Sequence, residues 1–444
     1  MKVAIIGTGY VGLPTGVGLA ELGHQVVCID RDVSKISTLQ EGKVTLYEEG
    51  LSELLKKNFA AGNITFTTSM ADGVVGAQLV LIAVGTPPHP VTHEADMRYV
   101  YEAATEMAQY LQQNSYTVVA NKSTVPVGTG DNVESLIAKN VAQEKFDVIS
   151  LPEFLREGYA VHDFFHPDRI VVGANTEAAK KVVYELYQPL LKLNPQCKLL
   201  QVSRRSSETI KYASNSFLAT KIHFINEMAN FCEKTGANIY EVAAGMGLDR
   251  RIGPSFLNPG PGFGGSCFPK DTMALDFMAR QNNLDMTLVQ ATINGNNQRI
   301  KDIATRILTA LDRAEEHPVV GVLGLAFKNG TDDCRVSPAM QILQEVLHSN
   351  SKLTVRVFDP QAMDNAKLLL ESYATRVTYC HSAEEVCQGA DVLAVLTEWP
   401  QFRDLDMKSA AELMRQRHIV DCRNMLNADT ARALGFTYRG IGIA

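Results

Sequence analysis

Residues 2–30 read KVAIIGTGYVGLPTGVGLAELGHQVVCID, and this stretch decides the fold. Met1–Ile6 is a short apolar run, typical of a buried parallel strand. It leads into Gly7-Thr8-Gly9-Tyr10-Val11-Gly12 and then an apolar helical stretch that stops at Gly23. A second strand follows and ends at Asp30. This order of strand, glycines, helix, strand and acid predicts a dinucleotide-binding unit.

The same stretch indicates which dinucleotide binds. The three glycines, Gly7, Gly9 and Gly12, permit a tight turn and let backbone N–H groups approach a pyrophosphate at the helix N-terminus. We expect Asp30 to bind the ribose hydroxyls and to repel a 2′-phosphate, which favours NAD over NADP. The nearby Arg31 and Lys35 weaken that preference. The alternative is a glycine turn that serves packing only.

Composition narrows the class of protein. A chain of 444 residues is too long for one core, so we expect two or three domains. A net charge of −7 argues against nucleic acid or an anionic membrane as the main partner. The eight cysteines form no Cys-x-x-Cys pair, so we expect free thiols, no metal site and a reducing compartment. With no signal-like leader and no apolar run long enough to span a bilayer, the expected location is the cytoplasm.

Alternating strands and helices continue through the first half. We expect a helix over 96–113 and strands over 78–84, 116–120, 146–150, 168–173 and 198–202. Thr86, Thr124, Glu153 and Glu157 follow the ends of three of these strands. In an open α/β sheet the ligand crevice lies outside the carboxyl ends of the strands, so these side chains are candidates for a site. Each alone has an alternative role as a helix cap or turn residue.

The middle of the chain is helical. Residues 205–234 contain no proline or glycine and predict one long helix, suited to the floor of a site and to a dimer interface. Lys211 and Asn215 are four residues apart and share a face of it. Lys211 either forms a surface ion pair with Glu208 or supplies charge beside a bound sugar. We expect further helices over 236–247 and 288–313, with Gly295 ambiguous in the latter.

A Gly- and Pro-rich loop over 249–262 leads to Gly264-Gly265-Ser266-Cys267-Phe268-Pro269-Lys270-Asp271. Proline suits a first helical turn, so Cys267 is expected at a helix N-terminus, where the helix dipole favours a thiolate. Lys270 adds a nearby positive charge, and Asp271 lies one turn further on the same face. This arrangement predicts a nucleophile. The alternative is a buried structural cysteine.

The last part repeats the pattern of the first. After a linker at 314–317, we expect strands over 318–323 and 353–358, the second followed by Asp359, and a helix capped by Ser337. Residues 382–393 echo residues 70–81, each a short helix that feeds a strand. The predicted fold is therefore α/β, with two Rossmann-like doubly wound domains joined by a long central helix. The expected domains are 1–203, 204–313 and 314–444.

Several signatures together resemble the UDP-glucose/GDP-mannose dehydrogenase family, over essentially the whole chain. They are the glycine fingerprint, Lys122-Ser123-Thr124-Val125-Pro126-Val127-Gly128, Pro152-Glu153-Phe154-Leu155-Arg156-Glu157-Gly158, Lys211 with Asn215, the cysteine segment and Ala326-Phe327-Lys328. Arg251-Ile252-Gly253-Pro254-Ser255-Phe256-Leu257 is most similar to the UDP-glucose branch of that family. The resemblance implies an NAD-dependent oxidoreductase that acts on a UDP-sugar and forms a homodimer.

The resemblance also implies site residues. It implies a nucleophile in Cys267, helped by Asp271, Lys211 and Asn215, with proton handling by Thr124 and Glu153 and with Glu157 between substrate and cofactor. The implied cofactor positions are Gly7, Gly9, Val11, Gly12, Asp30, Lys35, Thr86, Thr124, Glu157, Lys270 and Arg335. The implied substrate positions are Glu153, Phe154, Leu155, Arg156, Lys211, Asn215, Arg251, Phe256, Leu257, Asn258, Gly260, Gly264, Phe327, Lys328 and Arg423. Arg251 matches a residue that reaches into the neighbouring subunit. Asn258 departs from the lysine of some relatives, so that a diphosphate contact is missing or supplied elsewhere.

The chemistry explains why a thiol would accompany a dinucleotide site. Oxidation of a primary alcohol to a carboxylate removes two hydrides, and the second leaves only from a tetrahedral carbon. A thiolate that adds to the aldehyde creates that carbon, and a thioester then results for water to hydrolyse. GDP-mannose or UDP-N-acetylmannosamine oxidation is the alternative within the family. A non-catalytic sensor of NAD or nucleotide sugar is the alternative from another class.

Overall fold

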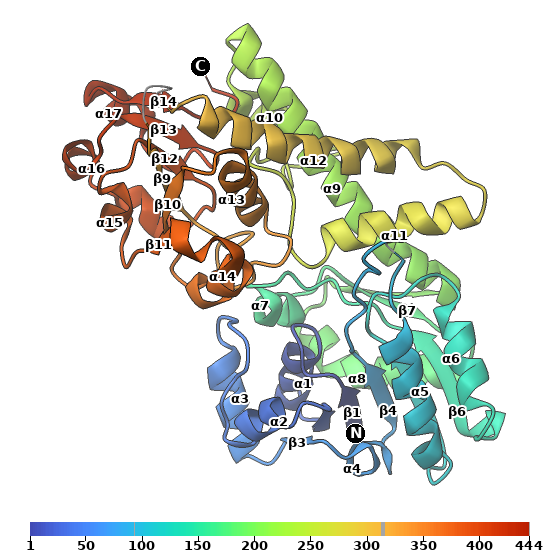
Figure 1. The fold of residues 1–444 in the computed structure, drawn as a ribbon. Coiled ribbons are helices and arrows are strands. Elements are labelled where there is room, and N and C mark those ends of the chain that lie inside the picture. Colours follow the sequence, from blue (N-terminus) through green and yellow to red (C-terminus); the bar gives the residue numbers. More distant parts are fainter. Residues whose placement is uncertain (93, 312–315, 444) are drawn as a thin grey trace. The chain divides into compact units, whose positions relative to one another are not determined.

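The computed structural model describes residues 1–92, 94–311 and 316–443. They form two compact units, Met1–Ser214 with Met273–Asn283, and Asn215–Thr272 with Leu284–Ala444 (Figure 1). Each unit contains one predominantly parallel sheet, so the predicted α/β class is confirmed. The expected boundary between 313 and 314 lies outside the described residues, as does the first half of the expected linker. The boundary at 203/204 stays a prediction.

The first sheet has eight strands in the order β3-β2-β1-β4-β5-β6-β7-β8. β1, β4, β5 and β6 are mutually parallel neighbours, so their carboxyl ends meet at one edge, as expected. β7 runs antiparallel to β6, with Ser150 opposite Gly173, a reversal for which the sequence carries no signal. The strands are β1 Lys2–Ile6, β2 Gln25–Ile29, β3 Ile64–Thr67, β4 Leu79–Ile82, β5 Thr117–Asn121, β6 Phe146–Ser150, β7 Arg169–Gly173 and β8 Lys198–Val202.

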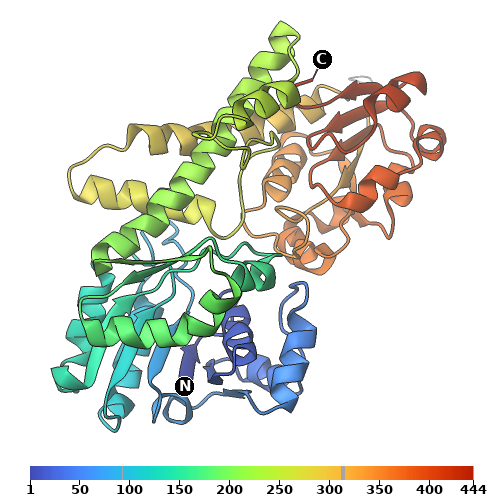
Figure 2. The ribbon, with the colours of Figure 1, turned by 180° about the vertical axis from the view of Figure 1, so that it is seen from behind.

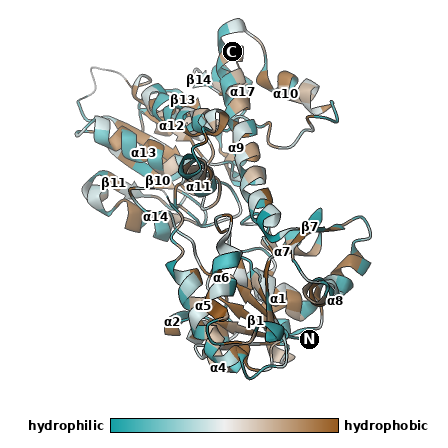
Figure 3. Cartoon of the chain, turned by 90° about the vertical axis from the view of Figure 1, so that its right-hand side faces the viewer, coloured by the Kyte–Doolittle hydropathy of each residue, from teal (hydrophilic) through white to brown (hydrophobic). Residues whose placement is uncertain are grey.

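Helices cover both faces of this sheet because its strands are apolar on both sides (Figure 3). Val3 and Ile5 of β1 pack in the core with α1 and α8, whereas Ala4 and Ile6 pack with α4, α5 and α6. The helices are α1 Gly12–Glu21, α2 Val33–Gln40, α3 Leu51–Ala60, α4 Met70–Val74, α5 Arg98–Leu111, α6 Thr129–Ile137, α7 Ala160–Phe165 and α8 Glu177–Leu193.

The second sheet has six strands in the order β11-β10-β9-β12-β13-β14, all parallel. Its inner strands repeat the arrangement of the first sheet: β12 lies beside β9 as β4 lies beside β1, which confirms the internal echo. The strands are β9 Val319–Leu323, β10 Thr354–Phe358, β11 Val377–Tyr379, β12 Val392–Val395, β13 His418–Asp421 and β14 Thr437–Arg439. The helices are α13 Pro338–Ser349, α14 Met363–Leu369, α15 Ala383–Cys387, α16 Met407–Leu413 and α17 Ala428–Ala433.

Four further helices lie between the sheets in sequence: α9 Arg204–Thr235, α10 Ile239–Gly247, α11 Phe268–Gln281 and α12 Thr287–Leu308. Figure 2 shows α9 as one long green helix, as predicted. α12 continues through Gly295 but ends at Leu308, before the expected end at 313. A Cβ at Gly295 would overlap the ring of His223 on α9. This glycine therefore permits close packing of two helices and does not break one.

Candidate functional site

Glycines shape the loop between β1 and α1 in two ways. Gly7 has φ +104°, and a Cβ there would lie 2.6 Å from the carbonyl oxygen of Ala83. A Cβ at Gly12 would overlap the carbonyl of Gly7. Both positions therefore need glycine for packing. At Gly9 a Cβ would meet nothing within 4 Å, and no side chain caps the N-terminus of α1 at Val11. This open, uncapped helix start fits a pyrophosphate.

Asp30 follows β2 and borders that loop. Its Oδ2 accepts hydrogen bonds from the N–H and Oγ1 of Thr8, at 2.9 and 2.7 Å, and its Oδ1 accepts from the N–H of Asp32. Burial alone would raise the pKa of Asp30, but the Thr8 and Asp32 hydrogen bonds outweigh it and lower the pKa. The carboxylate is thus charged at neutral pH and fits a ribose diol. Arg31, which was expected to weaken the preference for NAD, pairs with Glu102 at 3.0 Å.

Lys35 and Thr86 have different surroundings. The backbone N–H of Lys35 donates to Asp32, which caps α2, and its side chain is exposed. Thr86, after β4, is buried, and its Oγ1 donates to the carbonyl of Thr124 at 3.0 Å. The structure therefore brings Thr86 and Thr124 together at the carboxyl edge of the first sheet.

Glu153 and Lys211 form a buried ion pair at the same edge. Nζ of Lys211 donates to Oε1 of Glu153 at 2.9 Å, and both side chains are about 95% buried. Burial alone would raise the pKa of Glu153, but the charge and hydrogen bond of Lys211, with the N–H of Leu155, keep the pKa below its ordinary value. The alternative of a surface pair between Lys211 and Glu208 is wrong, because both partners are used elsewhere and both are buried.

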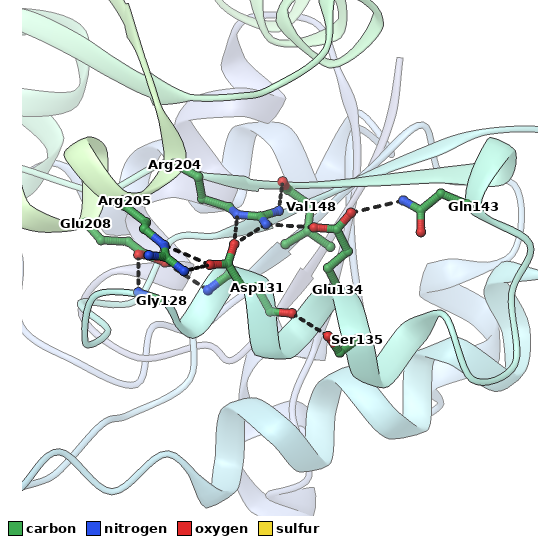
Figure 4. Close-up of polar contacts among 10 residues, drawn as sticks. Gly128, Asp131, Glu134, Ser135, Gln143, Val148, Arg204, Arg205 and Glu208 are labelled. Carbon is green, nitrogen blue, oxygen red and sulfur yellow. Dashed lines mark hydrogen bonds and ion pairs between the residues drawn. The ribbon is translucent and has the colours of Figure 1, made fainter.

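Polar contacts tie the first turn of α9, which precedes Lys211, to α6 and β6 (Figure 4). Glu208 accepts hydrogen bonds from the backbone N–H groups of Gly128 and Gly130, at 2.7 and 2.8 Å. Arg204 donates to the carbonyl of Val148 at 2.9 Å and pairs with Asp131 of α6 and also with Glu134. Because these contacts tie α9 to α6 and β6, they hold Lys211, one to two turns further on, against Glu153.

Lys122 lies at the same edge and is not among the predicted site residues. It follows β5 directly, its backbone N–H donates to the carbonyl of Ile82, and it is 7% exposed. Burial lowers the pKa of Lys122 to about 8; the charge of Glu153 opposes this shift, and the charge of Lys211 adds to it. A lysine just after the apolar run Val118-Val119-Ala120 is the sequence signal that could have singled it out.

The rest of the segment after β6 is less buried. Phe154 lies 3.8 Å below the guanidinium of Arg169 and 5.3 Å from the ammonium of Lys211. Arg156 is exposed and pairs with Asp163 at 2.6 Å, so this cation is held by its own unit. Leu155 and Glu157 are partly buried. Of this segment, Glu153 alone is buried among charged partners.

Cys267 lies immediately before α11. Its carbonyl accepts the N–H of Asp271 at 2.8 Å, which places the cysteine at the N-cap, as expected. It is partly exposed, and Cys197 is the one other cysteine that is not buried. The hydroxyl of Ser266 lies 3.7 Å from Sγ of Cys267. The alternative of a buried structural thiol is therefore wrong, and the position at a helix start favours a thiolate.

Asp271 is completely buried and holds two of the other candidates. Its Oδ2 accepts from Nδ2 of Asn215 at 2.6 Å, and its Oδ1 accepts from Nζ of Lys270 at 2.5 Å. Asn215 and Asp271 come from α9 and α11, 56 residues apart. The carboxylate of Asp271 thus links α9 to α11, the helix that directly follows Cys267.

The loop that precedes the cysteine, residues 256–267, is held by buried amides. Asn296 of α12 accepts from the N–H of Phe263 at 2.8 Å and donates to its carbonyl at 3.0 Å. Asn226 of α9 accepts from the N–H of Gly260, and Arg299 donates to the carbonyl of Gly260 at 3.1 Å. The sequence does not reveal the roles of Asn226, Asn296 and Arg299, because polar residues inside a helix carry no local signal for a loop 30 or more residues away.

The same loop packs against the C-terminal sheet. A Cβ at Gly260 would lie 2.9 Å from Nη1 of Arg423, and one at Gly265 would lie 2.7 Å from the ring of Phe327. A Cβ at Gly264 would lie 2.5 Å from the carbonyl of Val336. Lys328 lies 5.6 Å from the Phe327 ring, and Arg423 pairs with Glu398 at 2.9 Å. Gly260, Gly264, Phe327, Lys328 and Arg423 therefore gather in one place.

Other candidates lie at the surface of the second unit. Arg251 is 88% exposed and pairs with Asp249 at 2.6 Å. Arg335 pairs with Asp333 at 2.8 Å, and Asn258 is exposed. Phe256 has φ +63°, which is unusual for a bulky residue. The next residue, Leu257, is buried. The described residues contain no cluster suited to a metal ion and no helix long and apolar enough to cross a membrane.

Three family models match the chain. Residues 1–191 match the NAD binding domain of the UDP-glucose/GDP-mannose dehydrogenase family, residues 205–298 its central domain and residues 321–428 its UDP binding domain. The matches follow the order of the first sheet, the central helices and the second sheet.

Relatives of known name match along nearly their full length. The chain is 45% identical to the UDP-glucose 6-dehydrogenase of Rhizobium meliloti, over 100% of this chain and 99% of that protein. It is 41% identical to the UDP-glucose 6-dehydrogenase TuaD of Bacillus subtilis, over 99% and 93%. Among solved structures, a UDP-glucose dehydrogenase from Pyrobaculum islandicum is 36% identical with a TM-score of 0.90, over 100% of this chain and 98% of that one. A UDP-D-ManNAc dehydrogenase from Pyrococcus horikoshii is 26% identical with a TM-score of 0.85, over 100% and 99%.

Proposed function

Because the chain belongs to the UDP-glucose/GDP-mannose dehydrogenase family, we propose that it oxidises the 6-hydroxymethyl group of UDP-glucose to the carboxylate of UDP-glucuronate. Relatives named UDP-glucose 6-dehydrogenase, 45% and 41% identical over nearly full length, support this substrate. The cofactor is NAD. When NAD is bound, it accepts the hydride that each oxidation releases. The observation that carries the proposal is Cys267, partly exposed at the N-cap of α11 beside the buried Asp271.

Cys267 is proposed to act after the first oxidation. Its thiolate adds to the aldehyde carbon, which gives a thiohemiacetal, and the second oxidation of that carbon gives a thioester. Water hydrolyses the thioester and releases the thiolate. Asp271, held by Asn215 and Lys270, keeps the N-terminus of α11 and therefore the sulfur in place. Asn215 is also proposed to orient the sugar or the attacking water.

Lys211 and Glu153 are proposed to manage charge and protons. The ammonium of Lys211 stabilises the oxyanions of the substrate carbon, a contribution worth roughly 3–4 kcal/mol for one well-placed donor. Glu153 stays ionised because Lys211 lowers its pKa, and we propose that it activates water together with Thr124. Glu157 is proposed to lie between substrate and cofactor.

The two nucleotides are proposed to bind different units. In the first, the proposed NAD residues are Gly7, Gly9, Val11, Gly12, Asp30, Lys35, Thr86 and Thr124. Lys270 and Arg335, which the family resemblance also implies for NAD, belong to the second unit. In the second, UDP is proposed to bind where Gly260, Gly264, Phe327, Lys328 and Arg423 gather. Phe256, Leu257 and Asn258 belong to the same loop, and residues 153–156 of the first unit are further proposed substrate residues. The domain boundaries at 203/204 and 313/314 stay proposals, since the two compact units divide after Ser214 instead.

We also propose a homodimer formed through α9. Phe217, Phe224 and Phe231 are 63%, 45% and 60% exposed and recur every seven residues, which places them along one side of the helix. Such a row of exposed aromatic side chains is typical of an interface between proteins. Arg251 would then reach the site of the neighbouring subunit. A cytoplasmic location is proposed as well, in keeping with eight free cysteines.

The test is a count of NADH for each sugar consumed. The purified chain would be offered NAD with UDP-glucose, GDP-mannose or UDP-N-acetylmannosamine in turn. We expect two NADH for each UDP-glucose and the carboxylate as product. A ratio of one would reduce the protein to a simple alcohol dehydrogenase, and no NADH with any of the three would favour a nucleotide-sugar sensor. Preference for UDP-N-acetylmannosamine, the substrate type of the P. horikoshii structure, would move the chain to that branch.

A further inference from the structure

Lys122 is a buried cation that the proposed mechanism does not use. Among the described residues its ammonium group forms no hydrogen bond and no ion pair, although the residue is 7% exposed. Its backbone is fixed, because its N–H donates to Ile82 of β4 at 2.9 Å and Asn121 before it accepts from the N–H of Leu151. A largely buried ammonium group is costly to desolvate, and such a group beside other buried charges is a candidate for a role in function.

The charged groups that act on Lys122 are Glu153, from the segment after β6, and Lys211, from α9. Among the described residues, Glu153 forms its ion pair with Lys211, at 2.9 Å, and also accepts the N–H of Leu155 at 2.6 Å. The cluster therefore holds two ammonium groups and one carboxylate, all more than 90% buried, with a net charge of +1 when all three are ionised. One positive charge of this cluster has no counterpart in it.

We propose that Lys122 is a positioning residue for the reaction: its ammonium holds Glu153 ionised while the ammonium of Lys211 binds the oxyanion on the substrate carbon. This inference rests on the proposed function. As negative charge develops on the substrate oxygen, the ammonium of Lys211 interacts with that oxygen as well as with Glu153, so that its interaction with Glu153 weakens. Without a second cation the pKa of Glu153 would rise, and the carboxylate would take up the proton that it should pass to solvent. Lys122 supplies that second cation.

The pKa of Lys122 supports this role and sets its limit. Burial lowers the pKa from 10.5 to about 8. Below pH 8 the ammonium is charged and can support Glu153, and above pH 8 it becomes neutral. The folded chain then binds fewer protons at this site than the unfolded chain does, between pH 8 and the ordinary value of 10.5. The folded state therefore gains stability with rising pH in that interval while the reaction loses its second cation.

The experiment compares Lys122→Met and Lys122→Arg with the wild type, using the full chain, NAD and UDP-glucose. Methionine has a similar length and no charge, and arginine keeps the charge at every accessible pH. We expect kcat of Lys122→Met to fall tenfold or more, with KM for UDP-glucose within threefold. We expect the acidic limb of its kcat/KM profile to move to higher pH, because Glu153 loses a cation. For the wild type we expect kcat to fall above pH 8, and in Lys122→Arg this fall should move to higher pH.

Melting temperatures separate this role from a structural one. Lys122→Met should melt at the same or a higher temperature than the wild type at pH 7, with a smaller difference at pH 10, because the buried charge is gone. If Lys122→Met is less active than the wild type but melts at the same temperature, lost packing does not explain its lower activity. The inference is overturned if Lys122→Met keeps kcat within twofold with an unchanged pH profile, or if its kcat and melting temperature fall together. If the wild type does not oxidise UDP-glucose, the proposed function fails. The three proteins are then compared with the sugar nucleotide that the wild type does oxidise.

Discussion

Asp30 shows how far one carboxylate can set cofactor choice. It is held by Thr8 and Asp32, its pKa is lowered, and the neighbouring Arg31 is engaged by Glu102. We predict that Asp30→Ser raises KM for NAD at least tenfold and raises kcat/KM for NADP, because the charge that repels a 2′-phosphate is gone. Steady-state kinetics with both dinucleotides checks this. KM for UDP-glucose is the internal control, and an unchanged ratio of NAD to NADP use would contradict the assignment.

The ionisation of Asp30 also predicts a pH dependence. Its pKa is below the ordinary aspartate value, so the ribose contact is fully present above pH 4 and is lost as pH falls through that lowered pKa. We predict that the dissociation constant for NADH, followed by fluorescence, is constant from pH 8 to pH 5 as far as Asp30 is concerned. A rise centred between pH 5 and 7 that disappears in Asp30→Ser would contradict the lowered pKa.

Cys267 separates the two oxidations. We predict that Cys267→Ser makes no acid, because a serine hydroxyl without an adjacent base is a far weaker nucleophile than a thiolate. Mass spectrometry of the sugar product and the NADH count measure the outcome. Cys197→Ser is the matched control, since Cys197 is the other cysteine that is not buried. Acid formed by Cys267→Ser at a comparable rate would refute the covalent route.

At the scale of elements, α12 controls the shape of the cysteine loop, residues 256–267. Asn296 satisfies both backbone groups of Phe263. We predict that Asn296→Ala lowers the free energy of unfolding by about 1–3 kcal/mol, because two buried groups lose their partner. It should also raise KM for UDP-glucose more than KM for NAD. Asn297→Ala, at an exposed position of the same helix, is the control. Equal effects of the two variants in urea unfolding and kinetics would show that the loop does not depend on Asn296.

The repeated β-α-β elements show why a pattern can predict a fold without predicting a site. Asp359 follows β10 as Asp30 follows β2, and the N–H of Gly324 donates to Phe358 as that of Gly7 donates to Ile29. Asp359, however, is 1% exposed and accepts from the N–H groups of Leu325 and Ala326 and from Nε1 of Trp399. These internal partners leave no room for a ribose, which no local feature of the sequence reveals.

At the scale of the whole molecule, the row of Phe217, Phe224 and Phe231 predicts assembly. We predict that Phe224→Asp shifts a homodimer towards monomer in sedimentation velocity experiments, because a carboxylate would be buried at the interface without a partner. Leu193→Asp, at an exposed apolar position of α8, should leave the assembly unchanged. A wild type that sediments as a monomer at micromolar concentration would exclude this dimer.

Local rules were enough for much of this protein. The strands β2, β6 and β8, the span of α9, the cap at Ser337 and the N-cap position of Cys267 follow from apolar runs, glycines and prolines within a few residues. Tertiary structure alone decided which polar groups meet. Lys211 pairs with Glu153 across 58 residues, Glu208 caps α6 across about 80, and Asn296 holds a loop 33 residues away. The physical reason is that a buried charge or amide takes whichever partner the packing of distant elements brings to it, and a pattern of neighbouring residues does not contain that information.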